Sequence, residues 1–235
     1  MQPILFFDLE THANPAALAL LPEPKAPANL KDPAKIAAAV EEKKAERIAQ
    51  AALDPDTGVI AALGFRRYPD GPTTACLVGD EGLPDEAALI ARFWAELAAV
   101  RGRSAGYNVL GFDFPFLQRR SMSLGLRPAM PPVLAKYRTE PVTDLMASLF
   151  NWGPAKGLKT IAKLYGLPNP LPDINGSMVA EMDAATLRRY VANDVNLAVA
   201  LFESMDGIFW PAVLRHAVGA PCVNRVPAPD LPLEF

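Results

Sequence analysis

Four acidic residues interrupt otherwise apolar segments in three separate parts of this chain. Asp8 and Glu10 lie in PILFFDLETH, Asp113 lies in GYNVLGFDFPFL, and Asp194 lies in RRYVANDVNLAVALF. Burying a carboxylate is costly unless it is paired, hydrogen-bonded or bound to a metal. One such residue is readily an accident of packing, but four of them in three elements predict that they share a cation.

The composition predicts a soluble, cytoplasmic protein that does not associate with a membrane. The chain has 235 residues, of which 51% are hydrophobic, enough for one large core or a domain with appendages. No apolar run approaches the ~20 residues of a membrane span, and the start MQPILFFDLE lacks the features of a signal peptide. Cys76 and Cys222 are too few and too far apart for a disulfide framework or a zinc site.

The charge distribution is uneven along the chain. The net charge of −3 argues against a protein that coats nucleic acid generically, but residues 101–163 contain ten Lys or Arg against three acids. Solvated helix faces account for much of such an excess. A surface that attracts phosphate is the more specific interpretation.

Hydrophobic periodicity and turn residues predict an α/β chain with five strands. The expected strands are residues 3–9, 58–66, 73–79, 104–108 and 141–144. The expected helices are residues 85–101, 113–125, 145–151, 157–165, and one that follows an N-cap at Asp183 and ends near Met205. We expect one domain over residues 1–206 and a C-terminal tail over 207–235, with a short helix near 210–216.

Residues 13–56 separate the first two expected strands and form an insertion. Asp32 and Pro33 suit the cap and first position of a charged helix that ends near residue 53. Such a helix could guide a substrate, bind a protein partner, or be only a solvated surface element.

The first acidic motif is a pair. Asp8 and Glu10 are two residues apart, so on a strand both side chains lie on one face. We expect them at the carboxyl end of the strand, where ligands of open α/β sheets bind. A solvated strand end with two chance acids is the alternative, because the pattern D-x-E is common.

The second motif is more specific. Asn108, Phe112 and Asp113 belong to the pattern N-x3-F-D-x-P-F-L. Asp113 would begin a helix, where the helix dipole favours a carboxylate, so simple N-capping is the alternative. Capping, however, requires neither the phenylalanine nor the asparagine.

The third motif is the most informative geometrically. Leu187, Tyr190, Asp194, Ala198 and Leu201 fall on one stripe of a helix. Tyr190 and Asp194 are four residues apart and therefore neighbours. An acid in the middle of an apolar stripe faces the core or a cleft. A buried Asp bonded to a Tyr hydroxyl is the alternative, and it leaves the other three acids unexplained.

Together the three segments resemble the exonuclease motifs of the DEDD superfamily, the 3′→5′ exonucleases with an RNase H-like fold. The second motif is most similar to that of the proofreading domain of B-family DNA polymerases. Tyr190-x3-Asp194 matches the tyrosine subclass, since the histidine subclass would have His in place of Arg189. The resemblance extends from Ile4 to about Phe202. It implies an α/β, RNase H-like fold, with a mixed five-stranded sheet flanked by helices, in a stand-alone exonuclease domain.

The resemblance also implies a mechanism. Two Mg²⁺ or Mn²⁺ ions, roughly 3.5–4 Å apart, would lie on the carboxylates. Asp8 would bridge both ions, Glu10 and Asp194 would hold the one that activates water, and Asp113 would act on the second. Tyr190 would orient that water together with Glu10. Hard oxygen ligands suit these ions, and the absence of clustered His and Cys disfavours zinc. The product would be a nucleoside 5′-monophosphate released from a 3′ end.

Substrate contacts are implied less directly. The candidates are Leu9, Asn108, Phe112, Leu158 and Lys159. Asn108 and Phe112 match the positions that hold the terminal nucleotides of a single strand, and stacking of a base on Phe112 would contribute ~1–3 kcal/mol. Asp144 resembles the acid that ends the fifth strand in the family, and we expect its role to be only structural.

The segment GLKTI corresponds to a Ser/Thr-Leu-x2-apolar motif of the family. Leu158 and Ile161 match it, but Gly157 stands where the family has Ser or Thr. Lys159 and Lys163 are candidates for phosphate binding, with ordinary surface lysines as the alternative.

These observations favour a metal-dependent 3′→5′ exonuclease acting on single-stranded DNA. An exoribonuclease with the same chemistry is one alternative, because the residue that would sense a 2′-hydroxyl is unknown. A nucleic-acid-binding module that kept the fold without the chemistry is another. An endonuclease of the wider RNase H-like group is the third, and its acid pattern would not require Tyr190-x3-Asp194.

Overall fold

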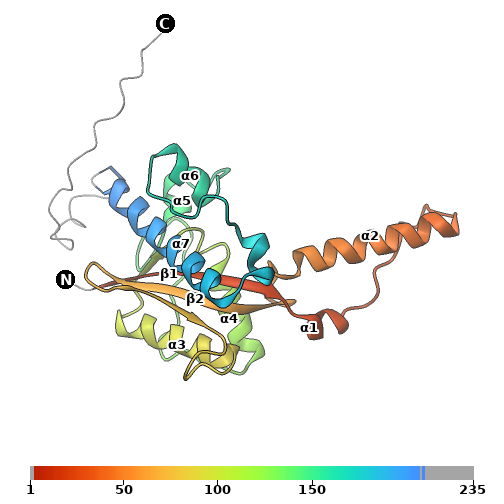
Figure 1. Cartoon of the computed structure of the whole chain (residues 1–235), viewed down its shortest axis with the longest axis horizontal. Coiled ribbons are helices and arrows are strands. Elements are labelled where there is room, and N and C mark those ends of the chain that lie inside the picture. Colours follow the sequence, from red (N-terminus) through yellow and green to blue (C-terminus); the bar gives the residue numbers. More distant parts are fainter. Residues whose placement is uncertain (1–2, 207, 210–235) are drawn as a thin grey trace, which may run out of the picture.

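Five strands form one mixed sheet in the order β3-β2-β1-β4-β5 (Figure 1). This computed structural model describes residues 3–206 and 208–209. The strands are β1 (Ile4–Ala13), β2 (Gly58–Tyr68), β3 (Thr73–Leu77), β4 (Ser104–Gly106) and β5 (Val142–Asp144). β2 runs antiparallel to both β1 and β3, whereas β1, β4 and β5 are parallel to one another. The sequence-based prediction of an α/β, RNase H-like fold with five strands is confirmed.

The alternating side chains of β1 build a core on each face of the sheet. Leu5, Phe7 and Leu9 are buried on the face covered by α3 (Glu86–Ala99) and α4 (Asp113–Ser123). Phe6 is buried on the opposite face. The helices that cover this second face are α5 (Leu145–Phe150), α6 (Leu158–Leu164) and α7 (Ala184–Met205) (Figure 1).

Helix α7 lies directly on the sheet because β2 has a glycine beneath it. Asp183 caps the helix by accepting a hydrogen bond from the Thr186 amide at 2.7 Å, as the sequence predicts. A Cβ atom added to Gly64 would lie 2.8 Å from the Val191 carbonyl oxygen. Any side chain at this position would push the helix away, so Gly64 fixes how closely the third acidic motif approaches the strands.

The first strand continues further than the sequence suggests. We expected it to end at residue 9, but it extends to Ala13 because residues 10–13 pair with β2 across a bulge between Glu10 and Thr11. The parallel pairing with β4 ends at Phe6. The acidic pair is therefore not at the end of its own strand. It lies on the stretch of β1 that projects beyond the ends of β4 and β5, next to a bulge of the kind that is common beside active sites.

The insertion forms an arm that extends away from the sheet (Figure 1). It contains α1 (Pro15–Ala19), which we did not expect, and α2 (Pro33–Ala51), whose Asp32 cap accepts a hydrogen bond from the Ala34 amide at 2.9 Å. The two ends of the arm meet at a narrow neck, where the Asn14 amide donates to the Thr57 carbonyl at 2.7 Å.

The other predicted elements occur within two residues of their expected ends, and one 3-10 helix, η1 (Gly176–Glu181), was not expected. Helix α7 ends at Met205. The predicted tail over 207–235 and its short helix near 210–216 lie outside the described residues, apart from 208 and 209, so the domain boundary stays a prediction. Among the described helices, none is long and apolar enough to cross a membrane.

Candidate active site

The acidic residues of the first and third motifs meet at one place on the α7 face of the sheet. Asp8 and Glu10 point to the same side of β1 as Phe6, and Asp194 comes down from α7 onto them. One carboxylate oxygen from each of these three residues lies within 4.8 Å of the others. The structure thus brings together three of the four acids from distant parts of the chain.

The fourth acid joins the cluster through the backbone. Asp113 is the first residue of α4, and it is only 2% exposed. Its carboxylate accepts a hydrogen bond at 3.1 Å from the amide of Leu9, which lies between Asp8 and Glu10. The cap position of α4 is occupied by Phe112 instead. Asp113 therefore reaches across to β1 and is not a simple helix cap.

Burial raises the pKa of all four carboxylates. It raises the pKa of Asp8 well above the usual value, and the charges of the three neighbouring acids add to the effect. Burial raises the pKa of Asp113 to about 7, although backbone hydrogen bonds oppose the change. Lys159 lowers the pKa of Asp8 and Glu10 without offsetting their burial. Ionising the cluster therefore leaves negative charge that a divalent cation would neutralise.

Tyr190 is buried at the edge of this cluster, with 4% of its surface exposed. Burial and the charges of Glu10, Asp194 and Asp8 raise the pKa of its hydroxyl. The group is therefore a neutral donor at physiological pH and not a base. The alternative in which a buried Asp194 is bonded only to Tyr190 is insufficient, because Asp8 and Glu10 are present at the same place.

Lys159, a candidate for phosphate binding, lies inside the cluster. Its ammonium nitrogen is 3.7 Å from an Asp194 carboxylate oxygen and 3.9 Å from the centre of the Tyr190 ring. It also donates to the carbonyl of Ile174 in the segment before η1. A lysine with about a fifth of its side chain exposed in such a position is not an ordinary surface lysine. Lys163, in contrast, is exposed.

The other predicted substrate contacts are placed differently. Leu9 is buried in the core at 5% exposure, so it offers the site its backbone amide and not its side chain. Phe112 is partly buried, and its ring centre lies 5.4 Å from that of Phe116. Leu158 packs in the core on the α7 face. Gly157 precedes α6 without a side-chain cap.

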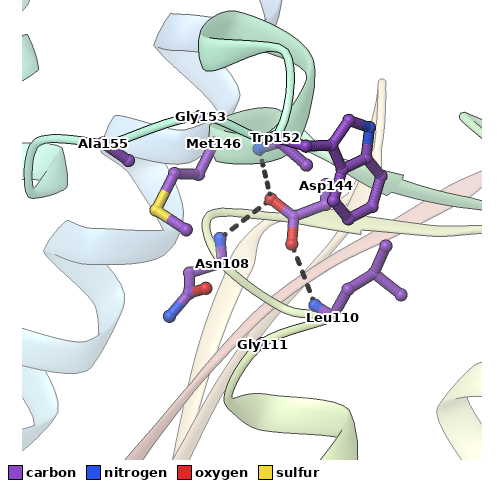
Figure 2. Close-up of a pocket in the computed structure, with 9 residues that line it drawn as sticks. Asn108, Leu110, Gly111, Asp144, Met146, Trp152, Gly153 and Ala155 are labelled. Atoms are coloured by element: carbon purple, nitrogen blue, oxygen red, sulfur yellow. Dashed lines mark hydrogen bonds between the residues drawn. The ribbon is translucent and has the colours of Figure 1, made fainter. Parts of the chain in front are cut away.

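Asp144 organises the loop that carries the second motif (Figure 2). Its buried carboxylate accepts hydrogen bonds from the amides of Asn108 at 3.2 Å, Leu110 at 2.9 Å and Ala147 at 3.0 Å. Asn108 has a left-handed backbone, with φ of 64°. Asp144 is thus structural, one of the roles considered from sequence, and it positions the loop that leads to Asp113.

Sequence reasoning did not anticipate two contributors to the site, Gly64 and the segment of residues 169–182. The Asn169 side chain accepts a hydrogen bond from Asn193 beside Asp194, and the Ile174 carbonyl receives Lys159. A lone glycine in a strand pattern does signal a close approach of backbones. The segment 169–182 has no such signal, because its contribution is made by a loop carbonyl and an amide.

A five-stranded mixed sheet in the order β3-β2-β1-β4-β5, with an acidic cluster at the ends of its parallel strands, gives this protein an RNase H-like architecture. Residues 70–202, more than half of the chain, match the family described as predicted 3′-5′ exonucleases related to the exonuclease domain of PolB, and the chain belongs to that family. The match includes Asp113, Tyr190 and Asp194. Asp8 and Glu10 precede it and are joined to the motif by the structure.

A solved structure shows the same fold. The family B DNA polymerase from the hyperthermophilic archaeon Pyrobaculum calidifontis superposes with a TM-score of 0.57 at 21% sequence identity. The alignment covers 87% of this chain and 24% of the polymerase chain, so the protein corresponds to about a quarter of that polymerase. No curated protein matches the sequence.

Proposed function

We propose that this protein is a metal-dependent 3′→5′ exonuclease that hydrolyses single-stranded DNA to nucleoside 5′-monophosphates. One observation carries the proposal: oxygens of Asp8, Glu10 and Asp194 lie within 4.8 Å of one another, with Asp113 bonded to the backbone between the first two. Buried acids without equal positive charge are unfavourable for stability. Their convergence is explained if they bind cations during a reaction.

The donor set fits magnesium or manganese. Its ligands would be carboxylate oxygens from Asp8, Glu10, Asp113 and Asp194, and hard divalent ions prefer such oxygens. Burial raises the pKa of all four groups, so the ionised cluster is unfavourable by itself, and a bound divalent cation would favour the charged form of each carboxylate. When bound, a pair of such ions would supply polarisation of the phosphoryl group and acidification of a water molecule.

The residues of the chain supply the remaining chemistry. Tyr190 keeps its proton because its pKa is raised, so its hydroxyl can donate a hydrogen bond that fixes the attacking water against Glu10. The Lys159 ammonium faces the same place and would attract the negative phosphodiester. Asp113, the first residue of α4, accepts a hydrogen bond from the Leu9 amide and so keeps its position against β1. We therefore place the protein in the tyrosine subclass of the DEDD exonucleases as part of this proposal.

The preference for DNA and for the 3′ end rests on membership of the family and on the likeness of the second motif to the proofreading domain. RNA carries the same phosphodiester, so both nucleic acids belong in the first experiment. We would incubate 5′-labelled single strands of DNA and of RNA with Mg²⁺, Mn²⁺ or EDTA. The expected result is a ladder of DNA that shortens from the 3′ end and disappears with EDTA.

Variants connect this activity to the site. Asp8→Ala and Asp194→Ala should abolish cleavage, whereas Tyr190→Phe should reduce it by about 10²- to 10⁴-fold, the usual contribution of a positioned proton donor or acceptor. Asp70→Ala, at an exposed turn after β2, is the matched control and should cleave normally. Undiminished cleavage by Asp8→Ala would show that these carboxylates are not the active site. Strand binding without any ladder would indicate a non-catalytic module.

A further inference from the structure

Aromatic and basic side chains gather around Trp152, in the loop that follows α5. The ring centres of Tyr137 and Trp152 are 5.2 Å apart in an edge-on arrangement. The Lys136 ammonium lies 5.1 Å from the centre of the Tyr137 ring and 5.8 Å from that of Trp152. Tyr137 is 71% exposed, so its ring faces solvent and is free to stack on a ligand. We call Lys136, Tyr137, Arg138 and Trp152 the tryptophan cluster.

Trp152 lines two cavities. The first has a volume of about 210 Å³ and is lined by Asn108, Leu110, Met146 and the indole of Trp152 (Figure 2). The second has a volume of about 250 Å³ and is lined by Tyr137, Arg138, Asn151, Phe209 and Trp152. Both are smaller than the ~300–1,000 Å³ of sites for drug-sized ligands. Each therefore suits one planar ring system, with an aromatic wall in common.

The backbone around these cavities is held in an uncommon conformation. The φ angles of Asn108, Tyr137, Asn151 and Trp152 are 64°, 65°, 47° and 63°. A left-handed conformation at a non-glycine residue costs on the order of 1 kcal/mol or more and persists only where the surroundings maintain it. Because all four residues line one or both cavities, the strained positions coincide with the surface that the rings form.

The first cavity adjoins the catalytic carboxylates through the second motif. Asn108 lines this cavity, and the same loop continues to Asp113. Asp144, at the end of β5, fixes the loop by accepting the Asn108 amide. β5 is two strands from β1, and neighbouring strands are ~4.8 Å apart, so the cavity begins about 10 Å from the acidic cluster along the edge of the sheet.

We propose that the tryptophan cluster binds the single-stranded nucleic acid upstream of its 3′ end. We call this binding path the track, and its direction rests on the exonuclease activity proposed above. The terminal phosphodiester lies at the carboxylates, and the preceding nucleotides pass Asn108 toward Trp152. Bases stack on the rings of Trp152 and Tyr137. Lys136 and Arg138, two of the ten basic residues in 101–163, meet the phosphates.

The test measures strand binding separately from hydrolysis. Binding of 5′-labelled oligothymidylate would be followed by fluorescence anisotropy in EDTA, with the full chain as wild type, Trp152→Ala, Trp152→Phe and Lys136→Ala. Loss of one stacked base weakens binding by on the order of 5- to 100-fold, so we expect this effect for Trp152→Ala. Trp152→Phe keeps an aromatic face and should retain most of the affinity.

Salt dependence distinguishes the role of Lys136. Removing one phosphate contact should lower the slope of log affinity against log salt concentration by about 0.7 in Lys136→Ala. The matched control is Lys35→Ala, on the exposed surface of α2, which loses the same charge and should change neither the affinity nor the slope. If Trp152→Ala does not fold, as judged by circular dichroism, the salt slope of Lys136→Ala still decides.

Two results would overturn the track: wild-type affinity in folded Trp152→Ala, or an unchanged salt slope in Lys136→Ala. Failure of the proposed function looks different. A wild-type protein that shows no ladder with Mn²⁺, yet loses strand binding on Trp152→Ala, would leave the track standing and refute the exonuclease. A normal ladder together with strand binding that does not depend on Trp152 would support the exonuclease and refute the track.

Discussion

Replacing Asp113 with asparagine should make the metal-free protein more stable while it removes activity. The introduced amide would have nearly the same shape as the acid, and its carbonyl oxygen can still accept the Leu9 amide, which is 3.1 Å from the carboxylate in the wild type. What the substitution removes is the ability to carry a charge at a position that is only 2% exposed. The active site and the stability of the fold are therefore expected to respond in opposite directions.

The size of the effect follows from the pKa of Asp113, which burial raises from 3.8 to about 7. Between these values the folded state holds a proton that the unfolded state has released. The free energy of unfolding therefore falls as pH rises through this window, by up to about 1.4 kcal/mol per pH unit. The fall amounts to about 4 kcal/mol and ends above pH 7. Asp113→Asn lacks this pH-dependent fall, so its gain in free energy of unfolding over the wild type increases from about pH 4 to about pH 7.

Urea unfolding in EDTA at pH 5 and at pH 7.5 measures this difference. Asp113→Asn should gain over the wild type by about 2 kcal/mol more at pH 7.5 than at pH 5. The exposed Asp70→Asn variant is the control and should follow the wild type at both pH values. Adding Mn²⁺ should stabilise the wild type more than the variant, because one ligand is lost. A variant that is less stable at both pH values, or a difference independent of pH, would refute the reasoning.

Three further predictions follow from the packing around the site. Gly64→Ala places a Cβ atom 2.8 Å from the Val191 carbonyl oxygen, so it should lower the free energy of unfolding by about 1–3 kcal/mol and, by displacing Asp194, reduce kcat. The control is Gly157→Ala, whose added Cβ meets no atom within 4 Å and which should not be destabilised in the same denaturation assay. In Asp144→Asn the side-chain oxygen can still accept the amides of Asn108 and Ala147, but the NH2 group then faces the N–H of Leu110, so the change should destabilise by about 1–3 kcal/mol and raise KM for long strands. An unchanged KM would show that the loop holds itself in place. Replacing residues 15–56 with a short turn should lower the free energy of unfolding by no more than about 2 kcal/mol, because Ala51 is the buried residue of α2. The shortened protein should retain metal-dependent cleavage, and unchanged substrate choice would exclude a guiding or partner-dependent role for the arm in that choice.

The fold and the acidic cluster were largely predictable because each depends on strong local patterns. Apolar alternation in β1 and the stripe on α7 define the faces that these elements bury, and a carboxylate within either pattern is conspicuous. From the sequence, Lys159 was only a candidate for phosphate binding, and its position beside the acidic cluster was not predicted. Its contact with Tyr190 depends on how α6 packs on α7, which no local pattern specifies.

The features that sequence reasoning did not foresee depend on tertiary pairing or on loop carbonyls. β1 was expected to end at residue 9 because ETHA is polar, but these residues pair with the start of β2 at the neck of the arm. The cluster at Trp152 joins a loop before β5 to a loop after α5, in which left-handed residues set the ring positions. Neither loop has a hydrophobic period that would have predicted the contact.

The narrow neck of the arm has a consequence for how the chain tolerates insertions. The chain leaves the sheet at Asn14 and re-enters it at Thr57, and a hydrogen bond joins these two residues. The ends of the arm are thus held together whatever the arm itself contains. Lengthening or shortening such a loop changes the closure entropy only with the logarithm of its length. A segment of another length or sequence could therefore replace the arm at this neck while β1 keeps its pairing with β2, and the same neck offers an engineer a place to graft a foreign peptide.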